Sequence, residues 1–504
     1  MFYLILLIAI IIRFLYFPDN IYFGYDQARD AFVALEILKG DLKLIGPTTA
    51  FEGLHHGVLY YYILAPLYWL GNMSPEFTAA AWRIFNAVGV FLIFYIAKIL
   101  FDKKTGLVAA LLFAVSFEQT QFAIFLHHPS LVVLSMMVFY LGLAEVIFAK
   151  KSYGLILAAL GFGSSIQFEF PLLYLVVPFL LVVAIFYKYF VKIPKKIVLI
   201  ACFSFILSVS TFVLAEIKYN FTTLNGLLGL LKFNPQKSLE TIASTYIYTV
   251  NKMISLNFTG NLIPSWWLAV IFLVILVVLL KNNEHRPKFV FLSIWFFSLI
   301  LTFVVNGGVE DVQRNIPLFY PNVGVSVSLV IFASFLLIKL YKKIKIMAVI
   351  LMIVVTVANL QLIQYKNPNG TIEDLTVQQG MLLGDEKKVL DYMYHESSGQ
   401  PFSVKAVTMP FFINTTWSYL FEWHGKKYGY LPVWNGKNAL GYPGNLVVDE
   451  KQETAPKKRF LILEPTRGIA PYLIDDYLKE ENYFTKVVDE KSIGAFIIQK
   501  RGKL

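Results

Sequence analysis

Charged side chains are scarce in this 504-residue chain. Lysine, arginine, aspartate and glutamate together make up 15% of it, and the mean hydropathy is +0.62. A soluble globular domain carries roughly a quarter charged residues, so this composition excludes a soluble globule. The sequence therefore predicts a polytopic α-helical membrane protein.

Cysteine and the usual metal-ligand spacings are almost absent from the sequence. Cys202 is the single cysteine, which excludes an intrachain disulfide, and no Cys-x-x-Cys or His-Glu-x-x-His pattern occurs. The sequence consequently predicts no metal ligands and no required cofactor, although a divalent metal remains open.

Basic residues are in excess, but they form no continuous surface. The formal net charge is +11, and the lysines and arginines occur in short clusters between apolar runs. Nucleic-acid binding would need basic and aromatic residues interleaved on one surface, and that pattern is missing. The clusters are typical of membrane topology signals, so nucleic acid is not expected as a partner and the lipid bilayer is.

Long apolar runs fill the first 365 residues. About 20 apolar residues cross a bilayer as a helix, and this length predicts eleven transmembrane helices. They are expected near 2–17, 78–99, 106–123, 130–149, 153–166, 170–187, 197–216, 264–280, 289–305, 316–338 and 346–363. The fifth is short and could fuse with the sixth into one broken span. The first has no basic n-region and no cleavage site, so it is expected to be a retained signal anchor.

The distribution of lysine and arginine predicts which side of the membrane each connection faces. With the N-terminus in the cytoplasm, every short inside turn is basic. These turns hold Lys98, Lys103 and Lys104; Lys150 and Lys151; Lys188, Lys192, Lys195 and Lys196; Lys281, Arg286 and Lys288; and Lys339, Lys342, Lys343 and Lys345. The sequence thus predicts a multi-pass protein of the plasma membrane whose long connections are extracytoplasmic.

Two domains are expected. Residues 1–365 form the membrane-embedded domain, with the first outer loop at 18–77, and residues 366–504 form a small extracytoplasmic α/β domain. In this second domain the patterns predict strands at Ser403–Met409, Arg459–Glu464 and Gly494–Gln499, and helices at Asp385–Glu396 and Pro471–Glu480.

The first outer loop contains an acidic motif around Asp26 and Asp30. These aspartates are four residues apart, so in a helix that begins near Gly24 both carboxylates lie on nearly the same face, with Arg29 beside them. Partial burial raises the pKa of a carboxylate toward the range in which it acts as a general base on a hydroxyl or amine. The alternative is structural: Asp26 caps the helix and Asp30 pairs with a neighbour.

Two amphipathic helices are expected in this loop. The motif helix carries Phe32, Leu35 and Leu38 on another side, which would let it lie along the membrane surface. The apolar run Val58–Leu70 predicts a second, re-entrant or interfacial helix.

His55 and His56 lie in the turn between these two helices. A protonated His56 could bind a phosphate oxygen, and a neutral one could bind a metal. Adjacent histidines are nevertheless a poor chelate, so metal binding is not the favoured interpretation.

Further polar residues mark the other outer turns. Arg83 begins the second span and is suited to a phosphate, because its planar guanidinium takes two oxygen atoms; the alternative is that it extends to the lipid headgroups. His127, His128, Glu169 and Arg314 occupy three more turns on the same predicted side. If the helices bundle, all these side chains converge on one outer face, which predicts a site there.

The order of these features resembles a known family. A first span, an acidic motif in a long outer loop, a turn like His-Pro-Pro-Leu and an arginine at the start of the second span are similar to the GT-C glycosyltransferases. The resemblance is in particular to the superfamily of protein O-mannosyltransferases and aminoarabinose transferases. The matching segments are Tyr25-Asp26-Gln27, His56-Gly57-Val58-Leu59 and Arg83-Ile84-Phe85-Asn86, within roughly residues 1–340.

The resemblance implies a GT-C-like fold and an inverting glycosyltransferase. Such an enzyme moves a sugar from a polyprenyl-phosphate donor to a protein, lipid or glycan acceptor on the outer face of the membrane. It implies Asp26 as the general base, with Asp30 as a second catalytic carboxylate, and a donor-phosphate site of Arg83, His56 and Arg314. The remaining candidates, for substrate binding, are Arg29, His55, His127, His128 and Glu169. The chain departs from the family pattern at Gln27, where many relatives carry a second acid, and at Gly57-Val58, where they carry Pro-Pro.

Two other functions remain open. A flippase of lipid-linked oligosaccharides or a secondary transporter would need charged or broken helices near the membrane midplane, and Gly161-Phe162-Gly163 is the one stretch that could be such a break. A receptor or scaffold would use the C-terminal domain, where an aromatic cluster between Trp417 and Trp434 could stack on sugars or form a core.

Overall fold

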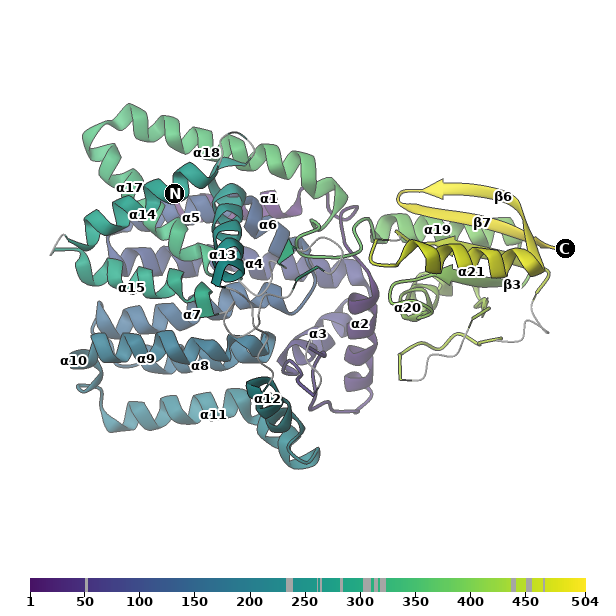
Figure 1. The fold of residues 1–504 in the computed structure, drawn as a ribbon, viewed down its shortest axis with the longest axis horizontal. Coiled ribbons are helices and arrows are strands. Elements are labelled where there is room, and N and C mark those ends of the chain that lie inside the picture. Colours follow the sequence, from purple (N-terminus) through teal and green to yellow (C-terminus); the bar gives the residue numbers. More distant parts are fainter. Residues whose placement is uncertain are drawn as a thin grey trace.

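The computed structural model describes residues 1–49, 53–232, 239–260, 262, 265–281, 284–301, 310–311, 316–317, 323–436, 441–449, 456–465 and 467–504. A helical part and a smaller α/β part lie side by side along the long axis of the molecule (Figure 1). Arg314, one of the predicted phosphate ligands, lies outside the described residues.

The described residues up to 369 are mainly helical. The helices are α1 (Phe2–Phe14), α2 (Tyr25–Leu38), α3 (Leu59–Leu70), α4 (Pro75–Leu100), α5 (Lys103–Val115), α6 (Phe117–Ile124), α7 (Pro129–Ile147), α8 (Gly154–Phe168), η1 (Phe170–Leu175), α9 (Val176–Ile185), α10 (Tyr187–Phe190), α11 (Lys195–Lys218), α12 (Thr222–Lys232), α13 (Leu239–Ile254), the π-helix η2 (Ser255–Thr259), α14 (Ser265–Leu280), α15 (Arg286–Phe297), α17 (Ser326–Lys343), α18 (Lys345–Lys366) and η4 (Asn367–Asn369). Two short strands, β1 (Glu310–Asp311) and β2 (Ile316–Pro317), pair antiparallel.

Within the described residues, four helices are long and apolar enough to cross a membrane: α4, α7, α11 and the continuous segment Lys345–Asn369. A fifth span results if α5 and α6, which meet at an angle of 56°, count as one. Shorter apolar helices cover Phe2–Phe14, Gly154–Phe168, Phe170–Ile185 and Trp266–Leu280. The count of eleven spans therefore stays a prediction.

Two boundaries differ from those expected. The single span expected at 106–123 is broken at Ser116, whose hydroxyl accepts a hydrogen bond from the backbone N–H of Gln119 and so caps a new helix, α6. The expected fifth and sixth spans are not fused, because the chain turns at Glu169 between α8 and η1.

Close packing of α7 against α8 fixes the ends of both helices. A Cβ atom on Gly161 would lie 2.3 Å from the backbone N of Phe139, and one on Gly142 would lie 2.3 Å from the backbone N of Ala158. Only glycine permits such an approach between helix backbones. This contact places the start of α7 beside the end of α8, where the site residues His128 and Glu169 lie.

The C-terminal part contains one five-stranded mixed sheet in the order β4-β3-β5-β7-β6. Its strands are β3 (Phe402–Val407), β4 (Val433–Trp434), β5 (Lys458–Leu463), β6 (Thr485–Ile493) and β7 (Phe496–Lys503), and its helices are α19 (Leu383–Ser397), α20 (Thr415–Trp423), η5 (Gly425–Tyr428) and α21 (Pro471–Phe484). β3 pairs parallel with β4 and β5, starting from Phe402 opposite Lys458, whereas β7 pairs antiparallel with β5 and β6. The expected strands and helices thus all occur, each with boundaries shifted by a few residues.

Alternation along the strands gives this sheet two apolar faces. Phe402 and Phe460 point to one face, where they belong to the same core as Trp417 of α20. Val407 and Leu461 point to the other face, against α21. Four aromatic residues of the cluster are consequently buried in the core: Trp417, Tyr419, Phe421 and Trp434.

The C-terminal domain packs against the first outer loop. Residues 21–23 form an antiparallel bridge with 381–383, through two backbone hydrogen bonds of 3.0 and 2.9 Å. Lys387 also forms an ion pair of 2.6 Å with Glu76. In Figure 1, α2 consequently lies between the helical part and the sheet.

Candidate active site

A cavity of ≈ 960 Å³ lies where the first outer loop meets the C-terminal domain. The first outer loop and the turn after α6 contribute mainly polar and aromatic residues: Tyr22, Tyr25, Asp26, Gln27, Arg29, Thr48, Tyr61, Phe125 and His127. The C-terminal domain contributes mainly apolar ones: Leu375, Val377, Met409, Pro410, Phe411, Ile469, Ala470 and Leu473. This volume suits a small-molecule site of ordinary size.

Helix α2 brings the two aspartates of the acidic motif to one arginine, as the sequence predicted. The guanidinium of Arg29 lies 2.7 Å from a carboxylate oxygen of Asp26 and 2.7 Å from one of Asp30. The side chain of Asp26 is 50% exposed and lines the cavity, whereas that of Asp30 is 1% exposed. The two carboxylates therefore have different surroundings on the same helix face.

Asp30 lies behind Arg29 and does not line the cavity. It accepts a second hydrogen bond, of 2.9 Å, from Nε of Arg29. Burial raises the pKa of Asp30 to about 6, although the neighbouring Arg29 acts to lower it. Burial alone would lower the pKa of Arg29, but the carboxylates of Asp30 and Asp26 raise it well above its ordinary value. Asp30 thus keeps Arg29 charged and in place.

The start of α2 shows what Gln27 does at the position where relatives carry a second acid. Its side-chain oxygen accepts the backbone N–H of Gly24 at 3.1 Å, and its amide donates to the carbonyl of Leu126 at 3.0 Å. Gln27, not Asp26, therefore satisfies the helix start, and the Asp26 carboxylate faces the cavity beside Arg29.

His127 lies next to Asp26 at the cavity wall. Its Nε2 atom is 3.7 Å from a carboxylate oxygen of Asp26. Burial lowers the pKa of His127 well below its ordinary value, so the imidazole is neutral at physiological pH. The described residues that line the cavity consequently include one anion, Asp26, and one cation, Arg29.

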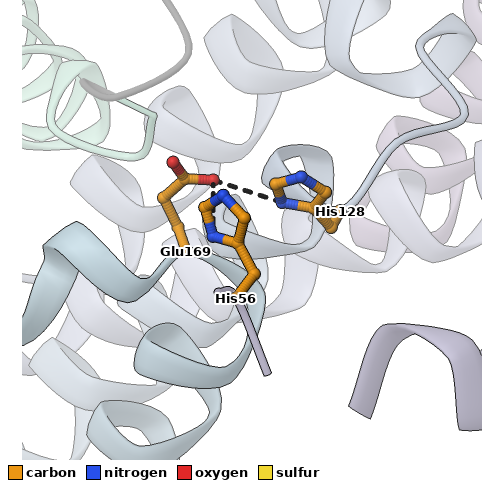
Figure 2. Close-up of side chains that lie close together, drawn as sticks. All are labelled: His56, His128 and Glu169. Carbon is orange, nitrogen blue, oxygen red and sulfur yellow. Dashed lines mark ion pairs between the residues drawn. The ribbon is translucent and has the colours of Figure 1, made fainter. Parts of the chain in front are cut away.

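A second cluster lies behind this wall and consists of His56, His128 and Glu169. One carboxylate oxygen of Glu169, Oε2, is 3.2 Å from Nδ1 of His128 and 3.8 Å from Nδ1 of His56. Figure 2 shows both rings turned toward this carboxylate. All three side chains are buried, and none of them lines the large cavity.

Burial sets the protonation of this cluster. It lowers the pKa of His56 and of His128 to about 3, and it raises the pKa of Glu169 to about 7. Both imidazoles are therefore neutral. The expectation that a protonated His56 binds the donor phosphate is not supported, because His56 is uncharged and lies away from the cavity.

The loop that carries His56 is held by its glycines. A Cβ atom on Gly57 would lie 1.9 Å from the side-chain oxygen of Gln167, and the Gly57 N–H donates to the backbone carbonyl of Gln167 at 2.8 Å. Glycine at this position, where relatives have proline, lets the loop pack directly onto the end of α8. His55 forms a backbone bridge with Thr48, and its side chain does not line the large cavity.

Arg83 is not at the cavity. Its side chain is 0% exposed, and it donates to the carbonyl of Arg13 at 2.9 Å and to the side-chain oxygen of Asn20 at 2.8 Å. It also lies over the ring of Phe17, 4.8 Å from the centroid. The structure thus places the guanidinium of Arg83 between α1, α4 and the start of the first outer loop.

Sequence reasoning missed the wall contributed by the C-terminal domain. Met409 follows β3, Leu473 lies on α21, and Tyr442 faces Tyr25 with ring centroids 6.0 Å apart. No short motif connects these residues, because they meet only through the fold of the sheet and its docking on the first outer loop.

Comparisons with known proteins show what this chain is similar to. Residues 55–215 match the family model of the dolichyl-phosphate-mannose-protein mannosyltransferases. No curated protein sequence matches the chain.

Solved structures match over nearly the whole length. ArnT from Cupriavidus metallidurans bound to undecaprenyl phosphate aligns with a TM-score of 0.62 at 12% identity, over 99% of this chain and 97% of that one. The same protein in the apo state aligns with a TM-score of 0.50 over the same shares. The archaeal oligosaccharyltransferase AglB from Archaeoglobus fulgidus aligns with a TM-score of 0.46 at 10% identity, over 86% of this chain and 64% of that one.

These findings confirm the resemblance predicted from the sequence. The family model matches the segment that contains the histidine turn and Arg83, and the structure of the whole chain resembles ArnT. The chain therefore has the fold of the GT-C glycosyltransferases.

Proposed function

We propose that the protein transfers a sugar from a polyprenyl-phosphate donor to an acceptor at the outer face of the membrane, with inversion at the anomeric carbon. The observation that carries this proposal is the Asp26 carboxylate, which lines a cavity of ≈ 960 Å³ while Arg29 links it to the buried Asp30. Displacement of a phosphate from a carbon atom is accelerated by a base that deprotonates the nucleophile and by a fixed cation that stabilises the leaving phosphate.

Asp26 acts as the general base in this proposal. Its half-exposed carboxylate accepts the proton of the acceptor hydroxyl or amine as the acceptor oxygen or nitrogen attacks the anomeric carbon. The bond from that carbon to the phosphate oxygen breaks on the opposite side, and polyprenyl phosphate leaves with the electron pair. One displacement from the face opposite the leaving group inverts the anomeric configuration.

Arg29 supplies the positive charge in the cavity. Its guanidinium is fixed by Asp30 before substrate binds, so no reorganisation is needed as negative charge grows on the leaving phosphate. Arg314 remains a predicted second ligand of the phosphate. Arg83 enters the proposal only as a residue that fixes the start of the first outer loop through Asn20.

A lipid-borne donor agrees with the surface of the helical part. On α11 only Ala201 and Ala215 are buried, while Phe203, Leu207 and other large apolar side chains are exposed, as expected of a helix that faces lipid. The similar ArnT structure contains undecaprenyl phosphate. We therefore assign the donor to the polyprenyl-phosphate sugars.

The proposed orientation places the C-terminal domain outside the cell. The basic turns between α10 and α11 and between α17 and α18 lie at the end of the helical part far from the sheet (Figure 1). In a Cys202→Ser background, a cysteine at the exposed Lys388 should react with a membrane-impermeant maleimide in intact cells. A cysteine at Lys343 should react only after permeabilisation, and the reverse pattern would contradict this orientation.

The reaction is tested by incubating the purified full-length protein with a panel of polyprenyl-phosphate sugars and candidate protein, lipid and glycan acceptors. We expect release of free polyprenyl phosphate that depends on both substrates. A flippase or transporter would move the lipid-linked sugar across the membrane of proteoliposomes. The bond between the sugar and the phosphate would stay intact. Movement without cleavage for every donor would therefore overturn the proposed function.

A further inference from the structure

We propose that His56, His128 and Glu169 form a structural site for a divalent transition-metal ion, with Zn²⁺ as the best fit. The three residues come from three separate segments: the loop before α3, the residue before α7 and the residue after α8. Their ligand atoms all lie within 4.8 Å of one another. The site stands apart from the proposed function, since none of the three residues lines the large cavity.

The spacing agrees with coordination of one ion. Zinc binds imidazole nitrogen and carboxylate oxygen at about 2.0–2.2 Å, so two ligand atoms at a tetrahedral angle lie roughly 3.4 Å apart. The observed separations from Glu169 Oε2 are 3.2 Å to His128 Nδ1 and 3.8 Å to His56 Nδ1. Small movements of the two rings would bring all three atoms to bonding distance.

One carboxylate oxygen of Glu169 lacks the hydrogen bond that a buried polar atom usually has. Glu169 is 3% exposed, and among the described residues its Oε2 atom accepts no hydrogen bond. A buried carboxylate oxygen without a partner costs free energy that a bound cation removes. Two imidazole rings face this carboxylate, and imidazole nitrogen is a common ligand of transition metals.

The donor set selects the class of metal. Two imidazoles and one carboxylate suit zinc, cobalt or nickel better than magnesium or calcium, which prefer oxygen ligands throughout. Three protein ligands leave a fourth position for water. The ion carries a charge of +2 and the ionised Glu169 a charge of −1. The carboxylate therefore neutralises half of the charge of the ion.

Backbone contacts of the same imidazoles compete with the metal. Nδ1 of His128 lies 2.6 Å from the carbonyl oxygen of Phe168, and Nδ1 of His56 accepts the N–H of Phe170 at 3.1 Å. An ion at this point replaces both contacts with ligand bonds, on either side of Glu169. If the two histidines serve only to make these backbone contacts, the protein binds no metal. The test below distinguishes the two cases.

The ion would hold the wall of the candidate active site in place. The ring of His128 lies against that of His127, with centroids 4.1 Å apart and planes tilted by 41°, and Nε2 of His127 lies 3.7 Å from a carboxylate oxygen of Asp26. Linking the three segments behind His127 therefore fixes the surroundings of Asp26 without contact between the ion and the substrate. The three ligands are positioning residues in this inference.

The test uses the full-length protein purified without a histidine tag, stripped with EDTA and then incubated with Zn²⁺. After removal of free ions we expect about one zinc per chain by inductively coupled plasma mass spectrometry, and a higher midpoint of thermal unfolding. Substitution with Co²⁺ should give the visible absorption bands of a four-coordinate site. His55→Asn is the matched control, since it removes the adjacent histidine and should keep the zinc.

Glu169→Gln and His128→Asn should each lose the zinc and the thermal shift. A wild-type protein that takes up no zinc overturns the proposal, and so does zinc that stays in both variants, which would mean an adventitious ion elsewhere. Because the wild-type measurements with Zn²⁺ and Co²⁺ decide between these outcomes by themselves, a variant that fails to fold does not leave the proposal untested.

Discussion

The two walls of the large cavity differ in chemistry and in origin. The wall from the first outer loop contains the charged residues Asp26 and Arg29. They lie three residues apart on α2, so the helix itself brings them together. The wall from the C-terminal domain is apolar, with Met409 and Leu473 from segments far apart in the sequence. We propose from this difference that the loop carries out the transfer and that the C-terminal domain binds the acceptor.

Asp26→Asn removes the proposed base and should have the largest effect. We expect the rate of polyprenyl phosphate release to fall by about 10²–10⁴-fold, because an amide cannot accept the acceptor proton. Asp41→Asn is the control, since Asp41 lies in the same loop and pairs with Lys43. Equal rates for wild type and Asp26→Asn would remove Asp26 from the mechanism.

Arg29→Gln removes the one described cation of the same wall and should reduce turnover by about 10²-fold. Arg29→Lys keeps the charge but loses the planar fork that binds Asp26 and Asp30 together, so it should recover only part of the rate. Steady-state kinetics at saturating donor distinguish these variants. If Arg29→Gln changed only the thermal unfolding midpoint, Arg29 would have a purely structural role.

Asp30 links the charged wall to pH. Because its pKa is raised to about 6, Asp30 is ionised above that pH and holds Arg29, and it becomes neutral below it. The rate should therefore fall as the pH decreases through about 6. Asp30→Asn should lower the rate at neutral pH by about tenfold and remove this acid limb. A pH–rate profile with an unchanged limb in Asp30→Asn would assign the titration to another group.

Leu473→Ala tests the apolar wall and should have the smallest effect. Leu473 is 36% exposed on α21 and lines the cavity, so its truncation leaves the sheet core intact. We expect the KM for the acceptor to rise by roughly fivefold, with the KM for the donor unchanged. A change in donor KM alone would mean that the C-terminal domain binds the donor instead.

The same contrast explains how far the sequence could predict the structure. Residues three and four apart on a helix lie on one face, so the proximity of Asp26 to Arg29 and to Asp30 was predictable from the sequence. The strands at 403–409 and 459–464 were predictable for a similar reason. The pattern of apolar residues within a short segment indicates a strand without knowledge of its partners.

Contacts between distant segments were not predictable in this way. The sequence predicted that His56, His128 and Glu169 lie on one outer face, but not that they touch, since this depends on the close glycine packing of α7 against α8. Arg83 fits the family motif, yet its guanidinium bonds to Asn20 and the carbonyl of Arg13, two partners that only the packing of α1 against α4 supplies.

The most direct test of the central claim is an electron cryo-microscopy structure of the protein in a lipid nanodisc with a non-hydrolysable polyprenyl-phosphate sugar. The account predicts the sugar in the large cavity, with its anomeric carbon on the Asp26 side and its phosphate toward Arg29. Donor density at a site that contacts neither residue, with the cavity empty, would contradict it.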